Sequence, residues 1–172
     1  MQKSKIKVNS GFTLIELLLY VSLSSIILLL VSVFIAALLG ARVKNQVIAE
    51  VEQEGIQVMQ VLTQTIRNAT AINSPGTGMS AALLSVDTVV SGNNPTVFDS
   101  SSGAIQITEG VASSVMLTNA TLVTVSALNF QNLTKPSTHG AIRVSFNLKY
   151  VNQSGRNEYD YSKTFYASAS LR

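Results

Sequence analysis

A single carboxylate lies near the start of a long apolar run, and its chemistry needs an explanation. Between Phe12 and Ala41 the only ionisable side chains are those of Glu16 and Tyr20. About 20 apolar residues are enough to cross a bilayer. A charged side chain at the centre of a membrane helix costs about 2.5–3.5 kcal/mol on insertion scales, and such residues usually pair with an opposite charge. The sequence therefore predicts a cationic partner for Glu16.

The best-suited cation is the α-amino group that Phe12 would gain if the chain were cut after Gly11. The lysines before this point are Lys3, Lys5 and Lys7. They mark the cytoplasmic side of the membrane, but they belong to a short polar leader, residues 1–10, that such a cut removes. Glycine has no side chain to obstruct the scissile bond. We therefore expect the new amine of Phe12 on a neighbouring copy to pair with Glu16.

Three simpler explanations remain open at this point. Glu16 could stand in the first helical turn only because a carboxylate there favours the helix dipole, by about 0.3–1 kcal/mol. The segment could also be an uncleaved signal anchor. An ordinary secretory signal peptide fits less well, because its apolar core is typically about 7–15 residues and a small-residue cleavage site follows it. Here the apolar run is longer, and the glycine precedes it.

A basic leader, the run GFTLIELL at residues 11–18 and a following apolar helix resemble the class III signal of type IV pilins and type II secretion pseudopilins. In that family a prepilin peptidase cuts after the glycine and usually methylates the new terminal phenylalanine. The glutamate five residues into the mature chain pairs with a neighbour's terminal amine. The resemblance therefore implies that Gly11 and Phe12 are the processing residues and Glu16 the assembly residue.

The same resemblance implies where the protein resides and what it contacts. It would cross the cytoplasmic (inner) membrane once, with its N-terminus in the cytoplasm and its head outside. It would then enter a pilus or pseudopilus, at the cell surface or in the periplasm. Its expected partners are the membrane, the prepilin peptidase, an assembly platform and other pilin or pseudopilin subunits.

Charge and cysteine content narrow the possible functions of the head. The net charge is +3, and loss of the three leader lysines brings the side-chain total to zero. A polyanion-binding surface needs clustered Lys and Arg, so we predict no direct binding of nucleic acid. The chain has no cysteine, which excludes a disulfide and a thiolate metal site. Because many major pilins carry a C-terminal disulfide, this absence favours a minor pilin, a pseudopilin or a lineage that seldom oxidises exported proteins.

The residues give little support for catalysis. The single histidine, His139, lies in a turn-forming run, and there is no Gly-x-Ser-x-Gly elbow. A metal site would need more histidines or a carboxylate cluster, and no Asp-rich loop has calcium-ligand spacing. We therefore expect no enzymatic activity, no catalytic residues, no metal and no cofactor.

The chain divides into five segments. Residues 1–11 form the cleavable leader, residues 12–41 the hydrophobic transmembrane and assembly half of one long helix, and residues 42–73 its amphipathic half. Pro75 ends the helix, so residues 74–82 are a linker before the β-rich head at 83–172. The apolar stripe of the amphipathic half has three- or four-residue spacing. It consists of Ile48, Val51, Gly55, Met59, Leu62, Ile66 and Ala69.

The head is predicted to be a β-structure. Runs rich in Val, Ile, Thr and aromatic residues predict strands at 83–90, 104–108, 114–117, 122–130, 141–151 and 158–171. A turn at 152–157 between the last two predicts an antiparallel hairpin. The expected fold class is α+β, in which a long N-terminal helix packs on an antiparallel sheet, as in pilins.

Two stretches carry a narrower resemblance. Residues 51–69 and 165–172 are similar to the corresponding parts of J-type pseudopilins and W-type minor pilins. This favours a minor pilin or pseudopilin subunit at a fibre tip or in an initiation complex. The alternatives are a major pilin, or a membrane-anchored exported binding or adhesion domain that is not built into a fibre.

Overall fold

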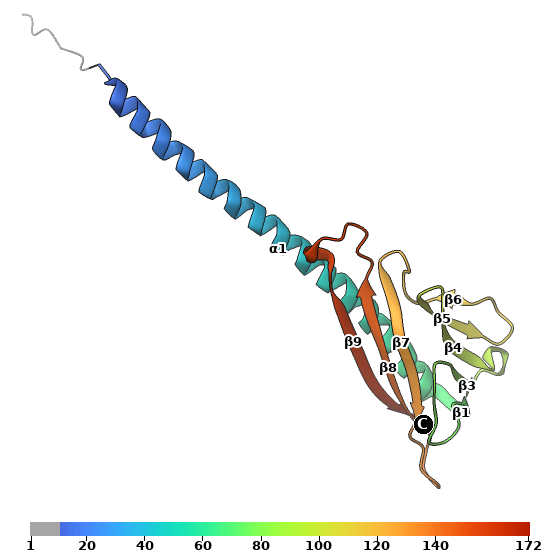
Figure 1. Cartoon of the computed structure of the whole chain (residues 1–172). Coiled ribbons are helices and arrows are strands. Elements are labelled where there is room, and N and C mark those ends of the chain that lie inside the picture. The colour runs from blue at the N-terminus through green and yellow to red at the C-terminus, as the bar shows by residue number, and fades with distance from the viewer. Residues whose placement is uncertain (1–10) are drawn as a thin grey trace, which may run out of the picture. The chain divides into compact units, whose positions relative to one another are not determined.

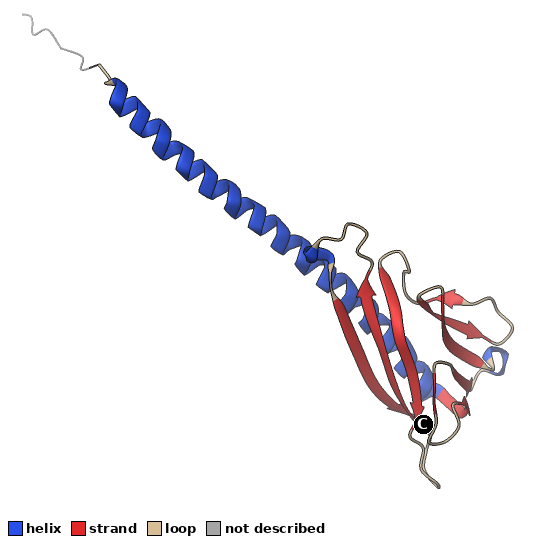
Figure 2. Cartoon of the chain, in the orientation of Figure 1, coloured by secondary structure: helices blue, strands red, loops and turns tan. Residues whose placement is uncertain are grey.

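The computed structural model describes residues 11–172, and they form one long helix followed by antiparallel strands (Figures 1 and 2). The chain separates into two compact units, Met1–Arg42 and Val43–Arg172. The second unit is called the head below, a wider range than the β-rich head predicted at 83–172, and it holds every strand of the described residues. This is the predicted α+β, pilin-like architecture.

Helix α1 (Leu14–Asn68) has 55 residues and belongs to both units. The run of apolar residues between 14 and 39 keeps its large side chains exposed. An 18-residue window of α1 reaches a mean hydropathy of 2.7, with none of the window buried. It is the one helix among residues 11–172 that is long and apolar enough to cross a membrane, and the sequence predicted its hydrophobic half at 12–41.

The predicted end of the helix at residue 73 is wrong. The helix stops at Asn68, and strand β1 (Ala69–Ser74) follows directly. β1 pairs antiparallel with β3 (Leu84–Thr88), where Ile72 lies opposite Val86. The backbone groups of residues 69–74 therefore bond to another strand instead of continuing the helical ladder. β-branched residues such as Thr70 and Ile72 accept the extended conformation readily.

The strands form two antiparallel sheets, as Figure 2 shows. The five-stranded sheet has the order β1-β3-β4-β5-β6, where β4 is Thr96–Ser101, β5 is Ala104–Glu109 and β6 is Val115–Met116. The four-stranded sheet has the order β2-β7-β8-β9, where β2 is Ser80–Ala81, β7 is Val123–Asn132, β8 is Ala141–Tyr150 and β9 is Ser162–Ser170. Two short 3₁₀ helices, η1 (Ser91–Asn93) and η2 (Asn157–Tyr159), lie in the connections.

Each of the six predicted strand segments contains a strand, and β8 and β9 pair antiparallel as predicted. Three strands, β1, β2 and β4, were not predicted from the sequence. β2 is a two-residue strand inside the predicted linker. β4 has only two apolar residues, Val97 and Phe98, between turn-forming residues, so its pattern is too short to recognise. Its pairing with β3 and β5 fixes it as a strand.

One side of α1 packs on the four-stranded sheet and supplies much of the core. Figure 1 shows residues 43–68 passing behind β7, β8 and β9. The buried helix residues are Val47, Val51, Gly55, Val58, Leu62 and Ile66. Four positions of the predicted stripe are therefore buried within the helix, Met59 is half-buried and packs against the core, and Ile48 is half-buried. Ile48 and Met59 each follow a fully buried valine, Val47 and Val58.

Gly55 allows the closest approach between α1 and this sheet. A Cβ at Gly55 would lie within 2.1 Å of the ring of Phe165, on β9. That ring also stacks on Phe146 of β8, with 5.4 Å between ring centroids. A glycine in the middle of a helix costs about 0.5–1 kcal/mol relative to alanine. Its presence here is explained by the space that Phe165 occupies.

Candidate functional site

The start of α1 brings together the residues that the sequence selected. Gly11, Phe12 and Thr13 precede the helix, and Glu16 stands in its first turn. The Thr13 Oγ1 accepts a hydrogen bond from the Glu16 backbone N–H at 3.4 Å, and the Thr13 carbonyl accepts one from Leu17 at 3.1 Å. Thr13 thus caps the helix in the threonine-x-x-glutamate arrangement that is common at helix starts. Thr13 was not among the residues predicted to be functional, although its spacing to Glu16 is present in the sequence.

The peptide bond after Gly11 is accessible in this structure. Gly11 is exposed, and a Cβ added to it would meet no atom within 4 Å. Phe12 is 70% exposed. Its ring centroid lies 5.7 Å from that of Tyr20, which is about two helical turns further along the chain. Backbone that precedes a helix and carries no bulky side chain can enter a protease cleft in extended form. The leader lysines at positions 3, 5 and 7 lie outside the described residues.

Glu16 is exposed on an apolar surface. Within residues 11–172, none of the three ion pairs includes it. Its nearest neighbours along the helix are Ile15 and Leu17, which are 76% and 54% exposed. In a membrane or in a bundle of such helices this carboxylate would stand in apolar surroundings, where an amine from another copy could pair with it.

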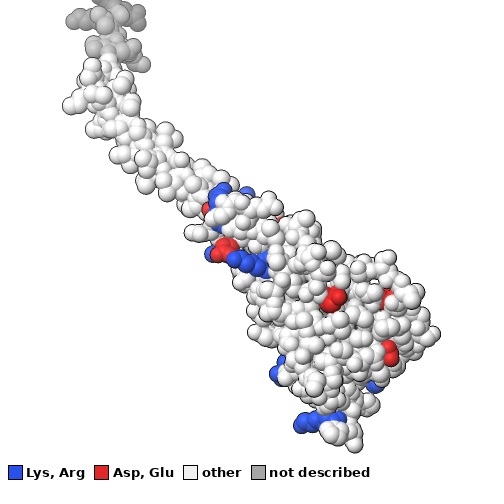
Figure 3. Space-filling model, turned by 45° about the vertical axis from the view of Figure 1, so that its right-hand side comes forward, with Lys and Arg blue, Asp and Glu red and all other residues white. Residues whose placement is uncertain are grey.

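The head carries few charges, and Figure 3 shows them scattered over one face. His139 is exposed in the connection between β7 and β8. Among residues 11–172 no group of three or more His, Cys, Asp or Glu side chains is arranged to hold a metal ion.

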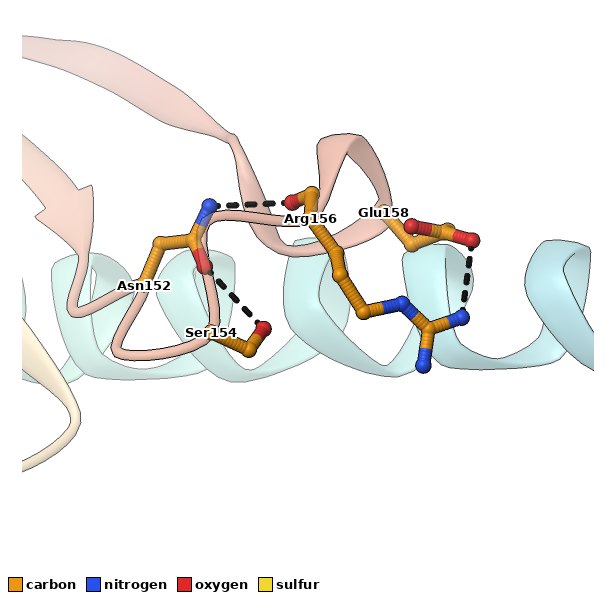
Figure 4. Close-up of polar contacts among 4 residues, drawn as sticks. All are labelled: Asn152, Ser154, Arg156 and Glu158. Atoms are coloured by element: carbon orange, nitrogen blue, oxygen red, sulfur yellow. Dashed lines mark hydrogen bonds and ion pairs between the residues drawn. The ribbon is translucent and has the colours of Figure 1, made fainter.

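A cleft lies beside the connection between β8 and β9, and Figure 4 shows the polar contacts of this loop. Asn152 organises this loop: its Nδ2 donates to the Arg156 carbonyl at 2.9 Å, and its Oδ1 accepts from the Ser154 hydroxyl at 3.3 Å. The Arg156 guanidinium donates to Glu158 at 3.0 Å. The cleft, of about 350 Å³, is lined partly by Tyr150 and Tyr159. Since Glu158 neutralises Arg156, the cleft offers no uncompensated charge from this pair.

Lys163 and Tyr150, which both ordinarily titrate near pH 10, have raised pKa values in the head. The Lys163 Nζ lies 2.6 Å from the Glu52 Oε1, which joins β9 to α1. This hydrogen bond and the charge of Glu52 raise the pKa of Lys163. Partial burial, followed by the charge of Glu50, raises the pKa of the Tyr150 phenol. In both cases the folded chain favours the protonated form.

These shifts predict that the head loses stability in alkali. A group whose pKa is raised by folding contributes stability that is fully present below its unfolded pKa, near 10 for both residues, and is lost as pH rises through the folded value. We expect the urea midpoint of the full-length chain in detergent to stay level from about pH 7 to 9 and to fall above about pH 10. Tyr150→Phe and Lys163→Met should each reduce that fall.

Tyr166→Phe is the matched control, because Tyr166 is 74% exposed on β9 and its replacement should leave the alkaline fall intact. A fall of equal size in all three variants would show that other groups cause it.

Comparison with known proteins finds a match in the N-terminal region of the chain. The family model described as the prokaryotic N-terminal methylation motif matches residues 6–32. No curated protein and no solved structure matches the chain significantly. The matched segment contains Gly11, Phe12 and Glu16 and ends within α1. This motif implies processing by a prepilin peptidase and assembly with other pilin subunits.

The match and the fold agree. The methylation motif overlaps the first part of α1, α1 is long and apolar enough to cross a membrane, and antiparallel sheets follow it. The chain therefore carries, at residues 6–32, the methylation motif that forms the class III signal peptide of type IV pilins, and its architecture is α+β and pilin-like.

Proposed function

We propose that this protein is a minor type IV pilin or pseudopilin, which is cut after Gly11 and built into a fibre at its tip or in its initiation complex. The observation that carries the proposal is the methylation motif directly joined to an exposed apolar helix with one carboxylate in its first turn. An ordinary membrane anchor needs neither the glycine nor the carboxylate.

In this proposal the residues at the start of α1 have separate roles. Gly11 gives the peptidase an unobstructed bond, and cleavage turns Phe12 into a terminal cation. Glu16 of the incoming subunit pairs with that cation on a subunit already in the fibre. A methylated amine keeps its positive charge, so methylation preserves the pair. The activity is mechanical, and we assign no catalytic residue, metal or cofactor.

The minor subtype is supported by the narrower resemblance of two stretches, which also pack on each other in the head. Residues 51–69 contribute Gly55, and residues 165–172 contribute Phe165, whose ring occupies the space above that glycine. The head also has no cysteine, unlike many major pilins. Subunit stoichiometry in sheared fibres would separate the subtypes: a minor pilin is a small fraction of the fibre mass, and a major pilin is most of it.

Processing is the first test. The native protein should have an N-methylated Phe12 at its N-terminus, and Gly11→Ala should leave the leader attached in most molecules, because even a methyl group obstructs the scissile bond. Intact mass and N-terminal sequencing of the protein from its own cells measure both. Gln57→Ala, on the exposed side of α1, is the control and should be processed normally.

Two results would contradict the proposal. A native chain that keeps residues 1–11 would be a signal anchor. One cut near residues 36–41 would be an ordinary secreted protein. The head would then have to be assayed as an independent exported domain.

A further inference from the structure

Strand β9 is a long unpaired sheet edge. It forms one side of the four-stranded sheet and pairs with β8 over nine residues without a register shift. Within residues 11–172 the other three sheet edges are poorer templates. β2 and β6 have two residues each, and the pairing of β1 contains two register shifts.

The free backbone groups of this edge can be identified from the pairing with β8. In an antiparallel pair, residues alternate between those that bond their partner and those that point away. Just beyond the two ends of β9, Tyr161 accepts from Tyr150 and Leu171 donates to Gly140. The odd-numbered residues therefore bond β8. The outward residues are Ser162, Thr164, Tyr166, Ser168 and Ser170, and all five have exposed side chains.

No other part of the described chain occupies this edge. The backbone hydrogen bonds outside the regular helix and strand pairings include none from residues 162–170. Natural sheets usually protect such edges with proline, a bulge, very short strands or free lysines. β9 has neither proline nor bulge. Its single lysine, Lys163, is tied to Glu52.

We propose that β9 is a docking edge, onto which a different pilin-like subunit adds an extended strand antiparallel to β9. This inference rests on the proposed function, because it takes the partner from the same fibre. Main-chain hydrogen bonds would supply much of the affinity. The outward Tyr166, which is 74% exposed, and its serine neighbours would contact the partner's side chains.

The chain's own edges explain why the partner is a different subunit. All strand pairs in the head are antiparallel, and this arrangement is also the more stable one. Figure 1 shows that residues 43–68 of α1 and β9 run in the same general direction. If β9 paired antiparallel with β9 of a second copy, the helical segments of the two copies would run in opposite directions. Subunits drawn from one membrane into a fibre all run in the same direction, so this pairing does not fit a fibre.

A second copy could instead offer β2, which already runs antiparallel to β9 because three antiparallel steps separate them in the sheet. β2 has only two residues, however, against nine in β9. A partner whose own edge strand is longer than β2 matches the edge better.

Amide hydrogen exchange gives a direct test. Full-length chain in detergent micelles is measured alone and after co-production with each of the other methylation-motif proteins of the same cell, one at a time. With the right partner, the amides of the five outward residues should exchange at least about tenfold more slowly, whereas the odd-numbered amides, already bonded to β8, should change little. Protection confined to other elements would overturn the inference.

Proline provides the matched variant. Ser168→Pro and Thr164→Pro remove an outward N–H and leave the β8 ladder intact, and proline is tolerated on sheet edges. Each should weaken the complex by about two- to tenfold, because a net hydrogen bond is lost. Ser168→Ala keeps the N–H and should change binding less than twofold. Equal thermal unfolding of the Pro and Ala variants would confirm that folding is preserved.

The outcomes separate this inference from the proposed function. The chain could be processed and enter fibres while both Pro variants bind and assemble like the Ala variant. In that case the proposal that β9 is a docking edge is wrong, and the proposed function is unaffected. Protection of the outward amides by unlabelled copies of the same chain alone would replace the different subunit with a homodimer and overturn the choice of partner. If the chain is never cut after Gly11, the proposed function itself is wrong.

Discussion

Glu16→Gln is expected to remove the subunit from fibres while cleavage after Gly11 proceeds normally. Glutamine has the same shape as glutamate and can still serve in the threonine-x-x-glutamate cap, so the helix start keeps its hydrogen bond to Thr13. Only the negative charge is lost. A buried, hydrogen-bonded charge pair that loses one partner costs about 2–5 kcal/mol, so incorporation should fall at least about thirtyfold.

The measurement is the amount of the subunit in sheared fibres relative to the membrane fraction. Glu109→Gln, an exposed carboxylate at the end of β5, is the matched control and should assemble normally. The size of the loss also decides between explanations of Glu16. If its role were only to favour the helix dipole, the effect would be about 0.3–1 kcal/mol. Unchanged incorporation would favour a membrane anchor that is not part of a fibre.

Gly55→Ala is expected to destabilise the head, although alanine is the better helix former. At an ordinary helical site the change would gain about 0.5–1 kcal/mol. Here the new methyl group would lie within 2.1 Å of the Phe165 ring, so the ring or the helix must move. Overpacking of this kind typically costs about 1–3 kcal/mol. The free energy of unfolding should therefore fall by about that amount in urea titrations of the full-length chain in detergent.

Phe165→Leu tests the cause of this loss. On its own it should destabilise the head, because Phe165 stacks on Phe146 in the core. Combined with Gly55→Ala, it should make the alanine less costly, which a double-mutant cycle reports as a favourable coupling. Gln57→Ala serves as control on the exposed side of the same helix. If Gly55→Ala stabilised the protein instead, the Phe165 ring would be able to move aside at little cost in free energy.

The helix boundary shows why local pattern is an incomplete guide. Residues 69–72 continue the apolar spacing of α1 and contain no proline, so the sequence predicted a helix until Pro75. In the structure Ile72 pairs with Val86, a residue 14 positions later. Helical propensity differs by less than about 1 kcal/mol among such residues, so the pairing of two strands outweighs it. The same holds for β4, whose extended conformation depends on its neighbours in the sheet.

The sequence by itself determined the candidate site and the fold class. Gly11, Phe12 and Glu16 were chosen because a carboxylate in a membrane-length apolar run needs a partner, which is a question of local chemistry that neighbouring residues answer. The same is true of the α+β order, because apolar periodicity is local to each element. Tertiary structure decided the end of α1, the need for glycine at position 55 and the unpaired edge of β9. Each of these depends on contacts between residues far apart in the chain, which local spacing does not encode.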